Sequence, residues 1–169
     1  FNTERLLRGT KRSTTEGGIR VPFIAWWPGE VKAGSVNDHQ LAFYDLMPTF
    51  CDVAGIENYV ERYTNKNLDV DYFDGLSFAP TLLGEGEQEE HEFLYWEFHE
   101  TNMMALRMGN WKLVVQNGNC RLYDLVTDLH EDNNLASQYP DVVTKMKEIL
   151  LREHTASSIS QFNSITLPQ

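Results

Sequence analysis

Positive charge is concentrated near the start of the chain, and binding chemistry is most evident there. Five of the 14 Lys and Arg residues lie in this stretch: Arg5, Arg8, Lys11, Arg12 and Arg20. The whole chain carries a formal net charge of −11 at pH 7. Against so acidic a background a cluster of cations is a natural place for an anion. A solvated basic face would give the same pattern.

A second polar group, Glu97-Phe98-His99-Glu100, comes at the end of a strand-like run. A histidine can exchange a proton near neutral pH, so His99 is a candidate for proton transfer. A polar strand end that faces water explains the same residues, and both interpretations stay open. Arg107 is a further candidate for binding.

The acidic run Asp69, Asp71 and Asp74 invites a calcium interpretation. The EF-hand spacing fails, because Phe73 takes a ligand position and Pro80 stands where the bidentate Glu belongs. We therefore predict no metal ligands in the chain. Its two cysteines, Cys51 and Cys120, are not at zinc-ligand spacing, and we predict that they are buried independently rather than joined in a disulfide.

Composition and charge exclude other classes of protein. Binding to nucleic acid requires Lys and Arg clustered over a surface, which a net charge of −11 disfavours. No apolar run approaches the ~20 residues of a membrane-spanning helix. The sequence opens on Phe1 without a signal pattern, so we expect a cut inside a longer protein, with any targeting segment upstream.

Two elements are predicted in the first half. Residues 19–27 are short, apolar on both faces and end at Pro28-Gly29, which predicts a strand buried in an α/β sheet. Asp45 to Ala54 reads as a helix with Asp45 as N-cap and Gly55 as its C-terminal stop. Residues 56–91 are predicted to be a long irregular connection. A strand followed by a helix is one step of an α/β fold.

The second half predicts a meandering antiparallel sheet. Hairpin signals separate the last three of its four strand-like runs. A helix from Pro140 to Glu153 offers an apolar side to cover one face. Before it, Asp128-x-x-Glu131 resembles a capping box. The runs are Phe93 to Phe98, Met103 to Met108, Trp111 to Gln116 and Arg121 to Leu125.

Several segments together resemble the sulfatase family. The stretch Leu7 to Pro22 is similar to the family's LRG-x-K … EGG-x-R-x-P pattern. The resemblance continues, in order and rough spacing, through the segments that start at Trp27, Asp45, Asp74, Gly109, Leu122 and Asn134. Each piece alone is weak, but their succession over nearly the whole chain is specific.

The resemblance implies a fold and a division of the chain. Sulfatases resemble alkaline phosphatase, with a large α/β domain and a smaller C-terminal domain built on a four-stranded antiparallel sheet. We therefore expect an α/β fragment of that type. Residues 1–87 would form the edge of the large catalytic domain, and residues 88–169 the C-terminal α+β subdomain with its sheet packed on the C-terminal helix.

The resemblance also assigns roles to residues. The lysine of LRG-x-K contacts the sulfate group in that family, and its counterpart here is Lys11. Gly17 and Gly18 would permit positive φ or close approach, and Glu16 and Arg20 could pair to brace the loop. The subdomain that carries His99, Glu100 and Arg107 closes over one side of the family's substrate pocket, so these three residues are candidates for binding sugar hydroxyls.

The family's nucleophile and metal site have no counterpart in the sequence. The nucleophile is a formylglycine made from the Cys or Ser of a C-x-P-S-R-type motif, which neither Cys51 nor Cys120 begins. The calcium ligands would also lie upstream of Phe1. The resemblance therefore implies calcium and formylglycine in the intact enzyme, neither within residues 1–169, and an isolated fragment without activity.

Two other functions stay open. A non-catalytic glycan-binding module would explain residues 93–169 but gives no reason for the loop around Lys11. A phosphonate or phosphate-ester hydrolase would share the scaffold and an anion-contacting residue. The expected partner is a sulfated small molecule or glycan. We also expect that the isolated fragment either self-associates through the exposed edge of strand 19–27 or leaves that strand poorly ordered. The family suggests a periplasmic or extracellular location, which the sequence itself does not show.

Overall fold

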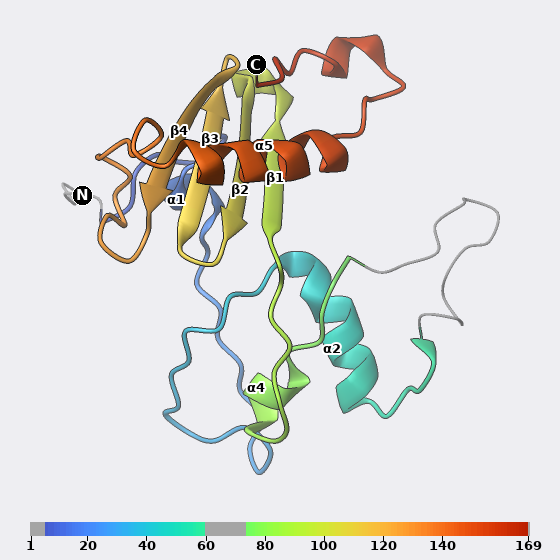
Figure 1. Ribbon diagram of the computed structural model, residues 1–169. Helices are drawn as coiled ribbons and strands as arrows, with labels where there is room; N and C mark the ends of the chain where they lie inside the picture. Colours follow the sequence, from blue (N-terminus) through green and yellow to red (C-terminus); the bar gives the residue numbers. More distant parts are fainter. Residues whose placement is uncertain (1–5, 60–73, 169) are drawn as a thin grey trace. The chain divides into compact units, whose positions relative to one another are not determined.

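The computed structural model describes residues 6–59 and 74–168, which form two compact units (Figure 1). One unit comprises residues 1–22 together with 92–169, and the other comprises residues 23–91. The described part of the chain contains no helix that is long and apolar enough to cross a membrane.

The first unit is built on a four-stranded antiparallel sheet in the order β1-β2-β3-β4. Its strands are β1 (Leu94–Phe98), β2 (Met103–Met108), β3 (Trp111–Gln116) and β4 (Asn119–Asp124). The meander predicted from the hairpin signals is therefore confirmed. Two strands match their predicted bounds, and β4 begins two residues earlier because the tight turn at Asn117-Gly118 leaves Asn119 free to pair with Gln116.

One face of this sheet is covered by α5 (Pro140–Glu153), which lies across the strands in Figure 1. Side chains alternate along a strand, so Leu113 and Val115 point to the same side. They join Leu122, Met146 and Leu150 in one buried core. The helix has the predicted bounds, with Pro140 in its first turn, where a missing amide donor is tolerated.

The opposite face of the sheet carries both apolar and polar side chains. Met103, Ala105, Val114 and Tyr123 form a smaller buried cluster there. By the same alternation Lys112 lies on this face, directly opposite Arg107 in the β2–β3 register and opposite Tyr123 in the β3–β4 register. Residues 6–20, including the one-turn helix α1 (Glu16–Ile19), pack against it.

The second unit holds η1 (Phe43–Asp45), α2 (Leu46–Val53) and α4 (Ala79–Leu83). The predicted helix from Asp45 is confirmed. The Asp45 side chain does not cap α2, however: it accepts hydrogen bonds from the amides of Ala42 and Leu76, at 2.6 and 2.9 Å. Helix α4 was not predicted, since its Pro80 and short length gave no helical period. The acids Asp69 and Asp71 lie outside the described residues.

Residues 19–27 do not form the predicted buried strand, and that prediction is wrong for this structure. Ile19 ends α1, and 21–27 have no regular structure. Ile24 and Trp26 are 88% and 85% exposed. A strand needs a hydrogen-bonding neighbour and a covered face. Residues 23–27 belong to the second unit, whose described residues contain no strand.

The units also differ from the expected division at residue 87. The loop of residues 6–20 packs with the C-terminal sheet, whereas 23–91 form their own unit. Assignment of 1–87 to a catalytic domain concerns the complete protein and stays a prediction. Cys51 and Cys120 are both free, as predicted; Cys51 is buried and Cys120 partly so.

Candidate functional site

Lys11 stands at the tip of a tight turn. The Ser13 amide donates to the Thr10 carbonyl at 3.0 Å, which closes a turn with Lys11 and Arg12 at its centre. Arg12 adopts a φ of 75°, the left-handed conformation that the third residue of a type II turn requires. Lys11 and Arg12 are both exposed. The structure thus presents the ammonium of Lys11 to solvent from a hydrogen-bonded turn.

Gly17 and Gly18 allow the chain to close tightly behind this turn. Neither has positive φ; what each provides is space. A Cβ on Gly17 would lie 2.6 Å from the Arg8 carbonyl oxygen, and one on Gly18 only 2.0 Å from that of Ser13. The Gly17 amide donates to the same Arg8 oxygen at 2.7 Å. Of the two predicted reasons for these glycines, close approach is therefore the one observed.

Glu16 fixes the loop to the sheet through a buried ion pair. Its Oε1 lies 2.6 Å from Nζ of Lys112, and both side chains are essentially inaccessible. The Lys112 ammonium also lies 5.0 Å from the ring centroid of Trp96, a cation–π distance. Arg107 and Arg20 approach Glu16 Oε2 at 3.9 and 3.8 Å. The predicted Glu16–Arg20 pair is thus present, but Lys112 is the closer partner.

The position of Glu16 follows from the strand register. Lys112 and Arg107 are cross-strand neighbours, and like charges so placed repel each other. A carboxylate between them offsets that repulsion. Because both partners of the Glu16–Lys112 pair are desolvated, removing either one leaves an uncompensated buried charge.

Glu131 completes the buried network from the opposite side. Its Oε2 accepts the backbone amide of Glu16 at 2.8 Å, while the Arg8 guanidinium donates to the Glu131 carbonyl oxygen at 2.6 Å. The predicted capping box is therefore wrong for Glu131, which is fully buried. Asp128 does accept amide hydrogen bonds in this turn, from Asp132 and Asn133.

Burial sets the protonation tendencies in this network. It raises the pKa of Glu131, and the nearby ammonium of Lys112 opposes the shift. It lowers the pKa of Lys112, and here the Glu16 carboxylate opposes it. Two oxygens, Oε2 of Glu16 and Oε1 of Glu131, have no hydrogen-bond partner. A proton on Glu131 would lessen the cost of two carboxylates in so dry a place.

Glu100 lies beside the Lys11 turn, whereas His99 packs against the C-terminal segment. Glu100 Oε2 lies 3.4 Å from the Arg12 guanidinium, and the Thr101 hydroxyl donates to the Arg12 carbonyl at 3.1 Å. Both come from η2 (His99–Thr101) at the β1–β2 connection. The half-buried ring of His99 packs on Phe162, with centroids 4.8 Å apart. Arg107 faces Glu16, so its charge is directed into the network.

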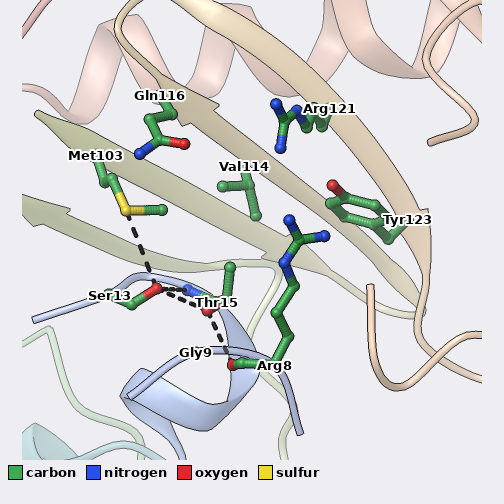
Figure 2. Close-up of a pocket in the computed structure, with 9 residues that line it drawn as sticks. All are labelled: Arg8, Gly9, Ser13, Thr15, Met103, Val114, Gln116, Arg121 and Tyr123. Atoms are coloured by element: carbon green, nitrogen blue, oxygen red, sulfur yellow. Dashed lines mark hydrogen bonds between the residues drawn. The ribbon is translucent and has the colours of Figure 1, made fainter. Parts of the chain in front are cut away.

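A pocket of about 160 Å³ lies between the loop and the sheet face that carries Tyr123 (Figure 2). Loop residues form one side and residues of β2, β3 and β4 the other. Figure 2 shows the polar ends of Arg8, Arg121, Gln116 and Tyr123 directed into the space between them.

The described residues do not bring three or more His, Cys, Asp or Glu side chains into an arrangement that could hold a metal ion. The acids of the loop network are paired with Lys112 or with backbone amides instead. These residues therefore do not fit a calcium centre, and no chemical step is assigned to calcium here.

The fold and the loop define a class of protein. A four-stranded antiparallel sheet with a C-terminal helix on one face is the C-terminal architecture of alkaline-phosphatase-like sulfatases. The solved structure of Ps i-CgsB matches with a TM-score of 0.69 and 27% identity, over 87% of this chain and 31% of that chain. The related structure of Ps i-CgsB in complex with k-i-k-neocarrahexaose matches with a TM-score of 0.68.

Sequence comparison gives the family. Residues 9–156 match the family described as N-sulphoglucosamine sulphohydrolase, C-terminal, and the chain belongs to this sulfatase family. It is 36% identical over 103 residues to N-acetylgalactosamine-6-sulfatase of Mus musculus, covering 60% of this chain and 17% of that protein.

A bacterial relative matches over a longer stretch. The chain is 30% identical over 161 residues to N-acetylgalactosamine-6-O-sulfatase of Bacteroides thetaiotaomicron, covering 86% of this chain and 29% of that protein. The chain therefore spans less than a third of the length of the curated relatives it matches.

Sequence reasoning missed Lys112 and Glu131 as parts of this site. Lys112 belongs to the quoted Gly109-Asn110-Trp111-Lys112-Leu113 segment, yet its strand position gave no reason to expect a buried ammonium. Alternation did offer a signal, because Lys112 shares its face with Val114. Glu131 gave none, since a loop acid close to a helix is usually exposed.

Proposed function

We propose that the complete protein is a sulfatase that hydrolyses sulfate esters, and that Lys11 contacts the sulfate group. The observation that carries this proposal is the exposed Lys11 turn, held by a buried ion pair within a family-matching segment. The relatives named above are sulfatases of N-acetylgalactosamine 6-sulfate. A sulfated carbohydrate is accordingly the proposed substrate class.

The role of Lys11 follows from the charge that develops during hydrolysis. As the S–O bond breaks, negative charge moves onto the sulfate and leaving oxygens, and a fixed ammonium stabilises it. Preorganisation matters here, because a donor that must first be ordered contributes less. The Thr10–Ser13 turn, the close packing at Gly17 and the Glu16–Lys112 pair all restrict the backbone that carries Lys11.

Glu100, His99 and Arg107 have different prospects as substrate-binding residues. Glu100 is exposed beside the Lys11 turn and remains a candidate for binding sugar hydroxyls. His99 and Arg107 are better supported as positioning residues. The His99 ring packs on Phe162, and the Arg107 guanidinium faces Glu16. Glu16, Gly17, Gly18 and Arg20 are proposed to support the site.

Residues 1–169 alone are proposed to be inactive. Neither cysteine begins a motif of the type that yields formylglycine. An ammonium that stabilises departing charge accelerates nothing without a nucleophile to attack the sulfur. The calcium and formylglycine of the family would therefore be supplied by other parts of the complete protein.

The first test compares the complete protein with its Lys11→Ala variant on an aryl sulfate and on N-acetylgalactosamine 6-sulfate, with calcium present. We expect kcat to fall roughly 100- to 1,000-fold, as when one preorganised charge-stabilising donor is removed. Lys32→Ala removes an exposed loop lysine elsewhere and should leave the rate unchanged.

Three results would contradict the proposal. Unchanged turnover by Lys11→Ala would remove the role of this residue. Cleavage of phosphate esters or phosphonates without cleavage of any sulfate ester would remove the proposed reaction. Retention of sulfated glycans without cleavage would instead favour a binding module.

A further inference from the structure

The pocket between the loop and the sheet has the charge of an anion site. Arg8 and Arg121 both direct their guanidinium groups into it, as Figure 2 shows. None of the described residues that line it is acidic. Two cations therefore share this cavity without a carboxylate in its lining, in a chain with a net charge of −11. Their mutual repulsion is relieved when an anion binds between them.

The pocket also offers neutral hydrogen-bond donors. The Gln116 amide and the Tyr123 hydroxyl point into the same space. Burial raises the pKa of Tyr123, although both arginines oppose the shift, so the phenol keeps its proton at neutral pH. Met103 and Val114 form apolar parts of the wall. An apolar wall lowers the local dielectric response and strengthens the attraction of the arginines for an anion.

The size of the pocket restricts the ligand to a single group. The pocket has a volume of about 160 Å³. Pockets that hold a whole drug-sized ligand measure roughly 300–1,000 Å³. A sulfate or carboxylate group fits, whereas a complete disaccharide does not, so such a group would enter while the rest of its molecule stays outside.

The pocket adjoins the turn that presents Lys11. Gly9 and Ser13 line the pocket, and each is two residues from Lys11. Consecutive Cα atoms are 3.8 Å apart, so the Lys11 Cα lies within about 8 Å of theirs. One extended anionic molecule can therefore reach both places.

We propose that this pocket, with Arg8 and Arg121 as its cations, binds a second anionic group of a polyanionic glycan, a sulfate or carboxylate other than the ester to be cleaved. This inference rests on the proposed function and deepens it, because it makes the preferred substrate an oligosaccharide with at least two anionic groups. Arginine suits the task, since its planar fork pairs with two oxygens of a sulfate or carboxylate.

Arg121 is the residue to change. It is exposed and lies on the edge strand β4, and its guanidinium hydrogen-bonds the hydroxyl of the buried Tyr123, a contact within reach of the ammonium in Arg121→Lys. Arg8 is less suitable, because its guanidinium also donates to the Glu131 carbonyl oxygen. The variants are Arg121→Gln, which removes the charge, and Arg121→Lys, which keeps it. Lys145→Gln, on the exposed side of α5, is the matched control for charge.

The test uses the complete protein and a matched pair of substrates. One is N-acetylgalactosamine 6-sulfate, which has a single anionic group. The other is the disaccharide of this sugar with a hexuronate, which adds a carboxylate. For Arg121→Gln we expect KM for the disaccharide to rise roughly tenfold, the loss of one charge-assisted hydrogen bond. The KM for the monosaccharide and both kcat values should stay as in the unaltered protein.

Direct binding of the disaccharide, measured by calorimetry, separates this proposal from the proposed function. Roughly tenfold weaker binding by Arg121→Gln, with Arg121→Lys and Lys145→Gln close to the unaltered protein, supports the pocket even if no ester is cleaved. Equal KM and equal binding in all variants would overturn it. So would a rise in KM for both substrates alike.

The last measurement is the binding of inorganic sulfate to the unaltered protein and to Arg121→Gln. If sulfate binds to the unaltered protein but not to Arg121→Gln, while the disaccharide binds equally to both, the pocket is a site for a free anion. That result would overturn the assignment to a glycan.

Discussion

At the scale of single residues, the buried charges behind the loop decide how Lys11 is presented. Glu16 contacts Lys112 through its side chain and Glu131 through its backbone amide, so one residue joins the loop both to β3 and to the segment between β4 and α5. A buried ion pair need not stabilise a protein relative to an apolar pair of the same shape. Its geometry nevertheless fixes a single arrangement of the loop, which an exposed ammonium at the tip requires.

The first residue-scale prediction concerns Lys112→Ala. The change removes the closest partner of the Glu16 carboxylate and leaves a cavity. We therefore expect the free energy of unfolding of the first unit to fall by about 3–5 kcal/mol. Amide hydrogen exchange of β3 in the complete protein would measure the loss. Lys145→Ala on the exposed face of α5 should change it by less than about 0.5 kcal/mol.

A double variant checks the cause. Glu16→Gln with Lys112→Ala removes the unpaired charge but keeps the cavity, and we expect it to be more stable than Lys112→Ala alone. If the double variant lost at least as much stability, cavity formation rather than the unpaired charge would be the cause.

The second residue-scale prediction concerns pH. Burial raises the pKa of Glu131 above its ordinary 4.5, so the folded chain holds this proton more tightly than the unfolded chain. Stability from this group is therefore complete below about pH 4.5 and declines as pH rises through the folded pKa. Each unit of upward shift costs about 1.4 kcal/mol at neutral pH.

Glu131→Gln removes that dependence, while its amide oxygen can still accept the Glu16 amide hydrogen bond. Amide exchange of β3, measured in both proteins between pH 4 and pH 8 and corrected for intrinsic exchange rates, would show the pH dependence that Glu131 causes. We expect the stability of the variant relative to the unaltered protein to improve as pH rises. A constant difference across this range would mean that Glu131 keeps its charge when folded.

At the scale of elements, Asp45 organises the second unit. Besides the amides of Ala42 and Leu76, its carboxylate contacts Nε2 of His91 at 2.9 Å. Thr49, one turn along α2, accepts the Phe78 amide at 2.9 Å. The start of α2 is thereby tied to residues 76–78. The resemblance between this chain and sulfatases at Asp45 and at Asp74-Gly75-Leu76-Ser77 thus has a common structural cause.

We therefore predict that Asp45→Ala loosens α2 without altering the sheet. Each buried donor left without a partner costs about 1–3 kcal/mol. Amide exchange should become faster in α2 and remain unchanged in β3, whereas Asp38→Ala, at an exposed position, should affect neither. Faster exchange in both units would show that they unfold together.

At the scale of the whole molecule, residues 21–27 carry apolar side chains that this chain leaves uncovered. Ile24 and Trp26 are the most exposed of them. The curated relatives are more than three times as long as the matched region, so much of their fold has no counterpart here. Exposed apolar patches favour association with another surface.

The whole-molecule prediction is that isolated residues 1–169 self-associate. We expect light scattering to give a mass above 19.5 kDa, and Ile24→Lys with Trp26→Lys to shift it toward that of the single chain. Val36→Lys, at an equally exposed apolar position in the same unit, is the control. A clean monomer by light scattering would contradict the prediction.

Local sequence patterns were enough to predict the sheet β1–β4 and helix α5. Four runs of period two, the hairpin signals and the apolar side of α5 are local features, so the sheet and its helix could be predicted almost to the residue. The Lys11 loop was recognisable because its residues are contiguous. The free cysteines and the helix from Asp45 were also predictable, the last because a cap-like acid and a stop glycine bracket it.

The contacts around these elements became visible only in the assembled fold. The decisive contacts join residues about 100 positions apart in the sequence. They are Lys112 with Glu16, Glu131 with the Glu16 amide, and Arg8 with Arg121 across the pocket. Local pattern carries no information about such pairs. The run 19–27 shows the converse: its apolar residues predict a buried strand, yet a strand depends on neighbours that the described chain does not supply. Burial and pairing are properties of the assembled fold.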